Sequence, residues 1–376
     1  MSERLRRILA SVLFTAGAFA LLFVLTGILK PITYSRDTWR DYKALAPNSV
    51  DVIVVGNSHA YTSFAPMQVW RDYGITTWNI GAPAINMRTK RAYVEELLKT
   101  QTPEVLALEV YSVDTLTQVE DQQNRWAYDF MPMGLPRVKA TMDTALPTMW
   151  ERYLVSIVNY HQNYSAIRAK DVALFLGVQD DPSRGGANAL SKPAKDKGEV
   201  AAAGNAQGIE AGANGDDAKG DTTASEDSTA TEAGELESGY QDSVSEIRRI
   251  ADMCAEKDIK LVLWLSPVQD DSYSGAKSPL LKLESDLRND YPEITYVNAS
   301  ERKSQIGLVA ADHRDWGHLY AWGMKKHTAW FVENVLADLG ITGPSDTPDA
   351  AWWDRESAQW NPPSSLAEAD AQEGDN

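Results

Sequence analysis

The chain has 376 residues, and this length allows one large domain or two small ones. The formal net charge of -17 argues against a nucleic-acid partner, because a phosphate backbone requires a basic binding face. Hydrophobic residues make up 43% of the chain, which is enough for a real core. The single cysteine, Cys254, excludes an internal disulfide and a thiolate metal site, and its helical context predicts a small buried side chain.

The amino terminus carries a long uncharged segment from Ile8 to Leu29. At about 1.5 Å per helical residue it reaches about 33 Å, enough to cross a bilayer core. Arginines precede the segment and only Lys30 follows closely, so the positive-inside rule leaves the amino terminus in the cytoplasm. A signal peptide cleaved after Ala20 is the alternative, but the apolar run continues well beyond that residue. We therefore predict that residues 1–30 are a cytoplasmic stub and a single-pass cell-membrane anchor, with the body outside.

Apolar strands alternate with helical patterns in the first part of the body, residues 31–179. After a polar lead-in we expect strands at Asp51–Val55, Trp78–Ile80 and Val105–Val110, and a helix over Met87–Thr100. The third strand is apolar except for Glu109. Residues 115–178 are rich in Trp, Tyr and Met, and we predict a helical insertion there that walls the site.

Residues 180–239 differ in composition, because they are mostly Gly, Ala, Ser, Thr, Asp and Glu and contain no aromatic residue. Such a segment buries too little apolar surface to offset its ordering entropy, so we predict a disordered insert. Residues 343–376 form an acidic tail, which we predict to be mobile, with local docking of its tryptophans open.

The second part of the body, residues 240–342, repeats the alternation of helix and strand. We expect helices at Val244–Lys257, Leu280–Asn289 and Trp322–Leu339, and strands at Ile259–Leu265 and Ile294–Val297. Strands that are apolar throughout belong to parallel sheets covered on both faces. The sequence thus predicts an α/β fold, a three-layer sandwich around a central parallel five-stranded sheet.

Ser58 stands where the first buried strand stops, in Gly56-Asn57-Ser58-His59. Ligands of open α/β sheets bind at the carboxyl ends of the strands, so this hydroxyl is a candidate nucleophile. A serine needs a base to remove its proton, and His318 with Asp315 three residues earlier precedes the last helix. The final loop of such a sheet faces the first, and we predict Ser58, Asp315 and His318 as the catalytic set.

The other histidines have weaker patterns. Asp312 and His313 are a fallback pair without the right spacing, His161 is expected at the surface or lining the cleft, and His327 is expected to be structural. No metal-ligand motif and no Gly-rich phosphate loop is present in the sequence, so we expect neither a metal nor a cofactor.

Four segments together resemble the SGNH/GDSL hydrolase superfamily. They are VDVIVVGNSHAYTSF (50–64), WNIGAPA (78–84), PEVLALEVYSVD (103–114) and DWGHLYAWGMKKHTAWF (315–331). The form Gly-Asn-Ser-His with a terminal His-Leu-x-x-x-Gly is similar to the membrane-anchored branch that includes the teichoic-acid D-alanine transfer protein and polysaccharide O-acetylation proteins. The resemblance implies the flavodoxin-like SGNH fold.

The resemblance also implies an oxyanion hole with three donors. The amide of Ser58 matches the first. The second donor is a glycine amide in this superfamily, and its position falls on Ala84. The Ala84 amide can still donate, but alanine tolerates fewer dihedral angles than glycine. The asparagine of the third falls on Val113, which has no side-chain donor, and losing one donor costs about 10²- to 10³-fold in rate.

Other residues near these blocks are candidates for the oxyanion or the substrate. Gly81, Asn86 and Tyr111 follow the second and third strands. His59, next to the nucleophile, has two open interpretations: it contacts substrate or oxyanion, or it packs back against the first helix.

The resemblance implies an extracytoplasmic serine esterase or acyltransferase that acts on O-acyl groups of a cell-envelope polysaccharide or teichoic acid. It implies a glycopolymer substrate and a multi-span membrane O-acyltransferase as partner. The alternative is a catalytically weak carbohydrate-binding or scaffold protein with the same fold. Val113 favours this alternative, and the Ser/Asp/His set opposes it.

Overall fold

A computed structural model describes residues 2–30, 34–113, 122–167, 172, 184–190 and 226–374. Its centre is a five-stranded sheet in the order β2-β1-β3-β4-β5, with every neighbouring pair parallel. The strands are β1 (Val52–Gly56), β2 (Thr77–Gly81), β3 (Val105–Glu109), β4 (Lys260–Leu265) and β5 (Thr295–Asn298). The predicted α/β class and parallel five-stranded sheet are confirmed, and this strand order is common in doubly wound sheets.

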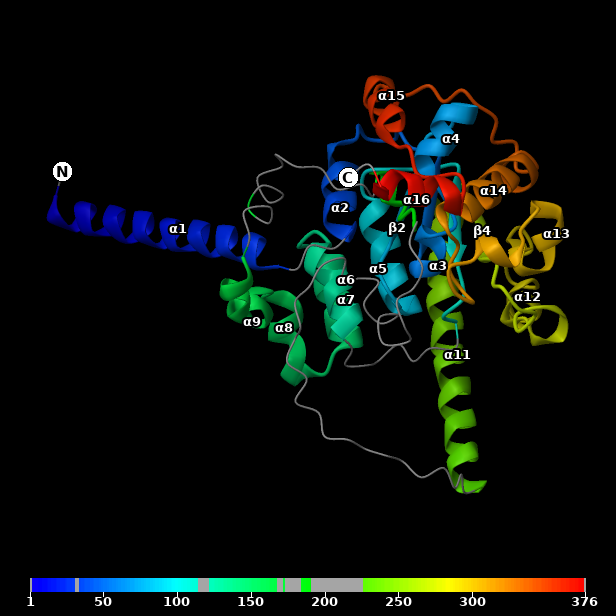
Figure 1. Cartoon of the computed structure of the whole chain (residues 1–376). Coiled ribbons are helices and arrows are strands. Elements are labelled where there is room, and N and C mark those ends of the chain that lie inside the picture. Colours follow the sequence, from blue (N-terminus) through cyan, green and yellow to red (C-terminus); the bar gives the residue numbers. More distant parts are fainter. Residues whose placement is uncertain are drawn as a thin grey trace.

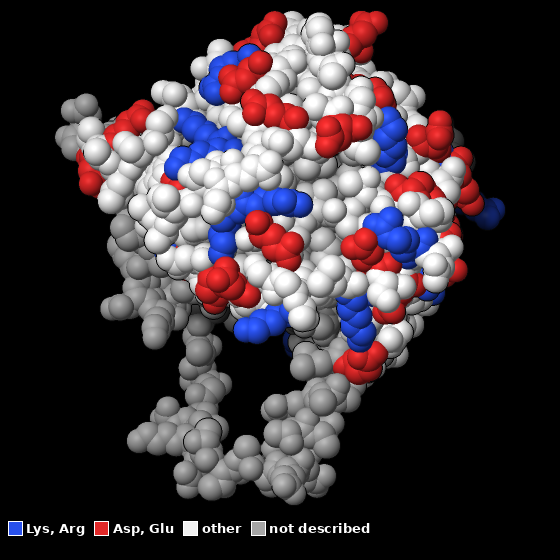
Figure 2. Space-filling view, turned by 90° about the vertical axis from the view of Figure 1, so that its right-hand side faces the viewer, with Lys and Arg blue, Asp and Glu red and all other residues white. Residues whose placement is uncertain are grey.

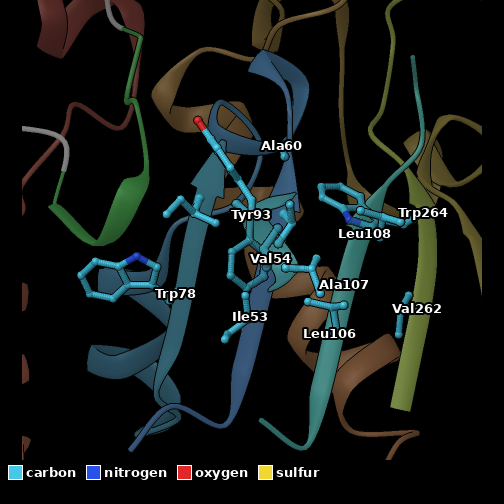
Figure 3. Close-up of a cluster of buried hydrophobic side chains, with 14 of the residues drawn as sticks. Ile53, Val54, Ala60, Trp78, Tyr93, Leu106, Ala107, Leu108, Val262 and Trp264 are labelled. Atoms are coloured by element: carbon cyan, nitrogen blue, oxygen red, sulfur yellow. The ribbon is translucent and has the colours of Figure 1, made fainter. Parts of the chain in front are cut away.

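The strands form because their side chains are buried on both faces of the sheet. Every residue of β1, β2 and β3 is buried. Figure 3 shows Ile53 and Val54 of β1 between Trp78 of β2 and Leu106 of β3. Burial on this scale is the main driving force for such a fold.

Helices cover the two faces of the sheet (Figure 1). One layer contains α4 (Pro66–Tyr73), α14 (Ala321–Phe331), which continues as the π-helix η8 (Val332–Leu336), and α15 (Ala350–Gln359). The other contains α5 (Met87–Leu97), α11 (Glu226–Glu256) and α12 (Pro279–Leu287). Cys254 on α11 is buried as predicted, and burial raises the pKa of its thiol to about 12.

The helical insertion is present in its described part. It comprises α6 (Gln122–Phe130), α7 (Leu135–Thr144), η1 (Pro147–Met149), α8 (Trp150–Leu154), α9 (Ile157–Tyr160) and η2 (His161–Ala166). It lies beside the end of α1 (Glu3–Leu29), which projects from the body in Figure 1. Among the described residues, α1 is the one helix long and apolar enough to span a membrane. Helix α2 (Tyr34–Ala44) follows it.

The insert over residues 180–239, which we predicted to be disordered, is ordered in its two described parts. Residues 184–190 pack onto the body, and α11 begins at Glu226 rather than near Val244. The backbone N–H of Asn188 donates to the Tyr61 carbonyl oxygen at 2.8 Å, and that of Ala321 donates to Leu190 at 2.7 Å. These bonds are made by backbone groups, so the amino-acid composition of the segment does not indicate them. The rest of the predicted insert lies outside the described residues.

The tail over residues 343–376, predicted to be mobile with docking of its tryptophans left open, is docked on the body in its described part. Helix α15 packs on α4, and α16 (Leu366–Gly374) follows it. Trp353 is fully buried, with its ring centroid 5.9 Å from that of Trp78. Asp349 Oδ2 accepts hydrogen bonds from Ser49 Oγ and from the Ala46 backbone N–H, both at 2.8 Å. Trp353 is one of the tryptophans whose docking was left open, whereas the acidic composition of the tail gave no sign of the contacts made by Asp349.

Candidate active site

Ser58 lies at the carboxyl end of β1, an interior strand of the sheet. It is the first residue of the short helix α3 (Ser58–Tyr61), and the preceding Asn57 caps that helix by accepting from the His59 backbone N–H at 2.9 Å. The cap fixes the sharp turn from strand to helix. Within the described residues, the Ser58 backbone N–H donates to no other group. The hydroxyl and a free amide therefore emerge at the same point.

His318 reaches Ser58 across the edge of the sheet. Its Nε2 lies 2.8 Å from Ser58 Oγ, and its Nδ1 lies 2.8 Å and 3.0 Å from the two carboxylate oxygens of Asp315. The structure thus brings together the three residues predicted as the catalytic set. The contacts form one chain from carboxylate to imidazole to hydroxyl, which is the arrangement that activates a serine nucleophile.

The three-residue spacing of Asp315 and His318 has a local cause. Asp315 Oδ1 also accepts from the backbone N–H groups of Gly317 and His318, at 3.0 Å and 2.9 Å. Burial disfavours the charged carboxylate, but the bonds from His318 and these amides outweigh it and lower the Asp315 pKa to about 2. The carboxylate is therefore ionised and held in place before any substrate arrives.

His59 lies between two other rings of the site. Its ring centroid is 3.9 Å from that of Tyr111 and 4.9 Å from that of His318, with interplanar angles of 22° and 28°. Burial, together with the nearby His318 and Lys90, holds the pKa of His59 well below its usual range, although Asp315 acts in the opposite direction. The neutral ring therefore stacks beside the candidate base without repelling it when that base becomes protonated.

Glycine is required at position 317 by this stack. A Cβ atom at Gly317 would lie 2.5 Å from His59 Cε1. The Nδ1 atom of His59 is buried and has no hydrogen-bond partner within the described part of the chain. His59 is thus held by its stacked neighbours and by a hydrogen bond with the Gly317 backbone, and the Asp-x-Gly-His form of the motif leaves space for its ring.

Aromatic side chains form one wall of the site. The rings of Tyr111, Tyr273 and Trp316 lie 5.0 to 6.3 Å apart, and those of Tyr273 and Trp316 are nearly parallel at 15°. Trp316 is 44% exposed, so part of this wall faces solvent. Flat apolar surfaces of this kind bind the faces of rings and acyl chains. Our sequence reasoning missed Tyr273 and Trp316, although Trp316 lies inside the catalytic motif.

The candidate oxyanion residues after β2 have different roles. Ala84 has φ +49°, a left-handed conformation that glycine adopts more easily, and its backbone N–H donates to no group within the described chain. Gly81 permits close packing of β2 on β1, because a Cβ there would lie 2.2 Å from the Gly56 carbonyl oxygen. Ala84 therefore keeps the backbone shape expected for an amide donor, whereas Gly81 is structural.

Two other predicted positions are engaged elsewhere. The Asn86 side-chain oxygen caps α5 by accepting from the Thr89 backbone N–H at 3.0 Å and from its hydroxyl at 3.1 Å. Val113 is fully buried, and its backbone N–H donates to the Val110 carbonyl oxygen at 3.2 Å. The Val113 amide is thus already used, so this position supplies neither a side-chain nor a backbone donor.

A fully buried ion pair lies beneath the site. Lys90 Nζ donates to the carboxylate of Glu109 at 3.1 Å and to its carbonyl oxygen at 2.6 Å. Glu109 Oε1 in turn accepts from the Tyr111 backbone N–H at 2.7 Å. Burial lowers the pKa of Lys90, although Glu109 opposes this. The pair fixes the start of the loop that carries Tyr111. Glu109 stood out in the sequence as the one polar residue of its strand, but nothing marked Lys90 as its partner.

Within the described residues, none of the remaining histidines hydrogen-bonds to Ser58. His327 is buried, with Nδ1 2.7 Å from the Ser63 carbonyl oxygen, and His161 is exposed. His313 is buried, and its neighbour Asp312 pairs with Lys326 at 2.8 Å. The described residues contain no group of three or more side chains that could hold a metal ion. On the face shown in Figure 2, basic and acidic side chains are interspersed.

Comparison with known proteins adds nothing to this geometry, because no family model and no curated protein matches the chain.

Proposed function

We propose that the chain is a serine esterase or acyltransferase of the SGNH/GDSL type that forms an acyl-enzyme on Ser58. The observation that carries the proposal is the 2.8 Å contact from Ser58 Oγ to His318 Nε2, with Asp315 bonded to the other ring nitrogen. A histidine between a carboxylate and a serine hydroxyl is the arrangement used for acyl transfer.

In the first half of the reaction, Ser58 Oγ attacks the carbonyl carbon of an ester, and its proton moves to His318 Nε2. The new C–O bond gives a tetrahedral oxyanion. His318 then returns the proton to the leaving alcohol oxygen as the old ester bond breaks. In the second half, water or an acceptor hydroxyl repeats these steps on the acyl-enzyme. Water yields a hydrolase, and a sugar or polyol hydroxyl yields a transferase.

The neighbours of His318 support its change of charge. Asp315 is ionised and stabilises the imidazolium that forms in the reaction. His59 stays neutral in its stack, so it adds no positive charge that would oppose protonation of the base. These features lower the energy of the charged intermediate relative to the resting site.

The oxyanion would be stabilised by the backbone N–H groups of Ser58 and Ala84. Both lack other acceptors in the described chain, and β1 and β2 are neighbours, so their loops open at the same edge of the sheet. Two donors rather than three imply slower turnover, by about 10²- to 10³-fold. The rate of the enzyme is thus limited on this side of the serine.

The proposed substrate is an O-acyl group of a cell-envelope polysaccharide or teichoic acid. Helix α1 would span the membrane with its amino terminus in the cytoplasm, because basic residues precede the apolar run. The aromatic wall of Tyr111, Tyr273 and Trp316 supports recognition of a sugar ring. A multi-span membrane O-acyltransferase is the proposed partner that would supply or receive the acyl group.

A fluorophosphonate probe tests the nucleophile directly. Full-length protein in detergent should be labelled on Ser58, and mass spectrometry after incubation with short-chain acyl esters should show the acyl adduct on the same residue. Labelling at another residue, or no labelling of a folded protein, would refute the acyl-enzyme.

A second candidate function is binding of envelope carbohydrate without catalysis. The burial of Val113 at the third oxyanion position favours it. Saturable glycan binding by a folded protein that is neither labelled nor acylated would support this candidate over the enzyme.

A further inference from the structure

Exposed apolar side chains are concentrated in the helical insertion. Outside α1, twelve large hydrophobic side chains of the described chain are exposed, and eight of them lie between Met133 and Ile167. The other four are scattered over the rest of the body. Scattered apolar residues are ordinary on a protein surface, whereas a local concentration marks an interaction surface.

The part of this concentration that runs from the end of α8 through η2 is amphipathic. Val155, Val158, Tyr164 and Ile167 are exposed by 48%, 37%, 73% and 40%. We call these four residues the apolar patch. Tyr153 and Tyr160 on the same elements are buried and attach the segment to the body. The segment is therefore docked on one side and presents apolar groups on the other.

The apolar patch lies beside the end of α1. Helix α9 and η2 both contact α1, and Figure 1 shows α9 next to the end of α1 that enters the body. The last residue of α1, Leu29, is only 7% exposed, whereas the apolar residues of α1 up to Leu25 are exposed. The ammonium group of Lys30 donates to the Asp129 carbonyl oxygen and lies 5.3 Å from the centroid of the Phe130 ring. The end of the helix is thus seated on the insertion.

The length of α1 sets the level of the patch relative to a bilayer. The helix has 27 residues, and at about 1.5 Å per residue it spans about 40 Å, against about 30 Å for the hydrocarbon core. Its last turn would therefore lie at the boundary of hydrocarbon and headgroups. Elements that contact this turn share that level, where aromatic side chains such as Tyr164 are enriched.

We propose that the apolar patch inserts into the headgroup region of the leaflet from which α1 emerges, so that the body is held on the membrane at two places. The proposal rests on the membrane-spanning role of α1 proposed above. Lipid is favoured over a protein partner because the patch flanks the anchor at interfacial depth, and short amphipathic segments bind there in the plane of the membrane.

Site-directed labelling in nanodiscs tests the patch. The full-length protein would carry a single environment-sensitive fluorophore on Val158→Cys or Tyr164→Cys, because Cys254 is buried and resists labelling. Leu281→Cys on α12 and Val309→Cys, in the segment before α14, are matched exposed apolar controls on the side of the body away from α1 (Figure 1). Phe14→Cys reports on α1 itself. Lipid carrying a doxyl quencher high on the acyl chain, in phosphatidylcholine with some phosphatidylglycerol, is compared with lipid quenched near the chain end.

The shallow quencher should reduce emission at positions 158 and 164 several-fold more than at 309 and 281, and the deep quencher should act mainly at position 14. Equal quenching at all four body positions, with position 14 quenched, would overturn the patch but leave the anchor intact. Absence of quenching at position 14 would overturn both. If the fluorophores at positions 158 and 164 are shielded in native membranes but not quenched in nanodiscs, a protein rather than lipid covers the patch, and the proposal is overturned. Fluorophosphonate labelling of each variant reports separately on the proposed enzyme.

Discussion

The two sides of Ser58 differ in how completely they are built. On the base side, His318 and Asp315 make short contacts, the carboxylate is fixed by two backbone N–H groups, and His59 packs against the imidazole. On the oxyanion side, a strained Ala84 stands at one donor position and a buried Val113 at another. The base side has the contacts that the proposed acyl-enzyme requires, whereas the oxyanion side has two of the three expected donors.

This difference also separates two kinds of residue. The base side depends on side-chain chemistry, which changes sharply when one atom type is replaced. The oxyanion side depends on backbone amides, which survive many substitutions at a moderate cost. Variants on the two sides should therefore differ in the size of their effects.

Replacing Ser58 tests the base side with the largest expected effect. In Ser58→Ala, hydrolysis of a chromogenic acetyl ester should fall by about 10⁴- to 10⁶-fold, because the nucleophile is lost while binding remains. The matched control Ser304→Ala, at an exposed serine on α13 (Lys303–Ile306), should keep full activity. Substantial activity in Ser58→Ala would remove the distinction between the two sides.

Replacing the carboxylate tests whether the base side works as a unit. Asp315→Asn should lower kcat by about 10³- to 10⁴-fold, because an amide favours the wrong tautomer of His318. Asp271→Asn, at an exposed aspartate, is the control and should change kcat little. A loss of less than about tenfold in Asp315→Asn would mean that His318 acts without its carboxylate.

Acid should lower the stability of the fold as well as the activity of the site. A variant of His327, which lies outside the site, separates these two effects. Burial lowers its pKa to about 4, so between about pH 6.5 and pH 4 the unfolded chain binds a proton that the folded chain does not. The free energy of unfolding should therefore fall by about 3 kcal/mol as the pH decreases through this range. Urea unfolding of wild type and His327→Gln, followed by Trp fluorescence, should show a shallower pH slope in the variant. An unchanged slope would refute this assignment.

Variants of His59 decide to which side this residue belongs. His59→Ala should lower kcat/KM by about 10- to 100-fold through loss of the stack, a loss of about 1 to 3 kcal/mol. His59→Phe keeps a flat neutral ring and should retain most of the activity. If the two variants are equally impaired in kcat while both remain folded, a ring nitrogen acts on substrate or oxyanion, and His59 belongs to the oxyanion side.

Ala84 should give the smallest effect. Ala84→Gly relieves a left-handed conformation at the cost of greater freedom in the unfolded chain, so the free energy of unfolding should rise by about 0.5 kcal/mol. The matched control Ala82→Gly, a buried residue two positions earlier with no positive φ, should instead be destabilising. Turnover by Ala84→Gly should change by less than about twofold, because the amide remains. A large loss of turnover would mean that the methyl group itself shapes the site.

Sequence reasoning reached much of the fold and the base side because those features are local patterns. The strand before Ser58 is a continuous apolar run, and the spacing of Asp315 and His318 is set by a turn that they form themselves. Each pattern is read within a few residues of sequence. The order of the elements along the chain was then enough to predict a parallel sheet.

The features that were missed depend on contacts between distant segments. Lys90 resembles any surface lysine of a helix until Glu109 from the next strand is placed against it. Tyr273 joins the aromatic wall from a loop after β4. The φ angle of Ala84 has no signal in the residue type, since alanine seldom adopts it. Such features become visible only once the chain is folded.

Helix α15, near the carboxyl terminus, has a practical consequence for anyone who shortens this protein. Expression of a trimmed fragment ending near residue 342 would remove Trp353 from its place against Trp78 and leave Ser49 without its bond to Asp349. The side of the sheet nearest β2 would then be open to water and to other copies of the fragment. Such a fragment should aggregate, and its inactivity would say nothing about catalysis.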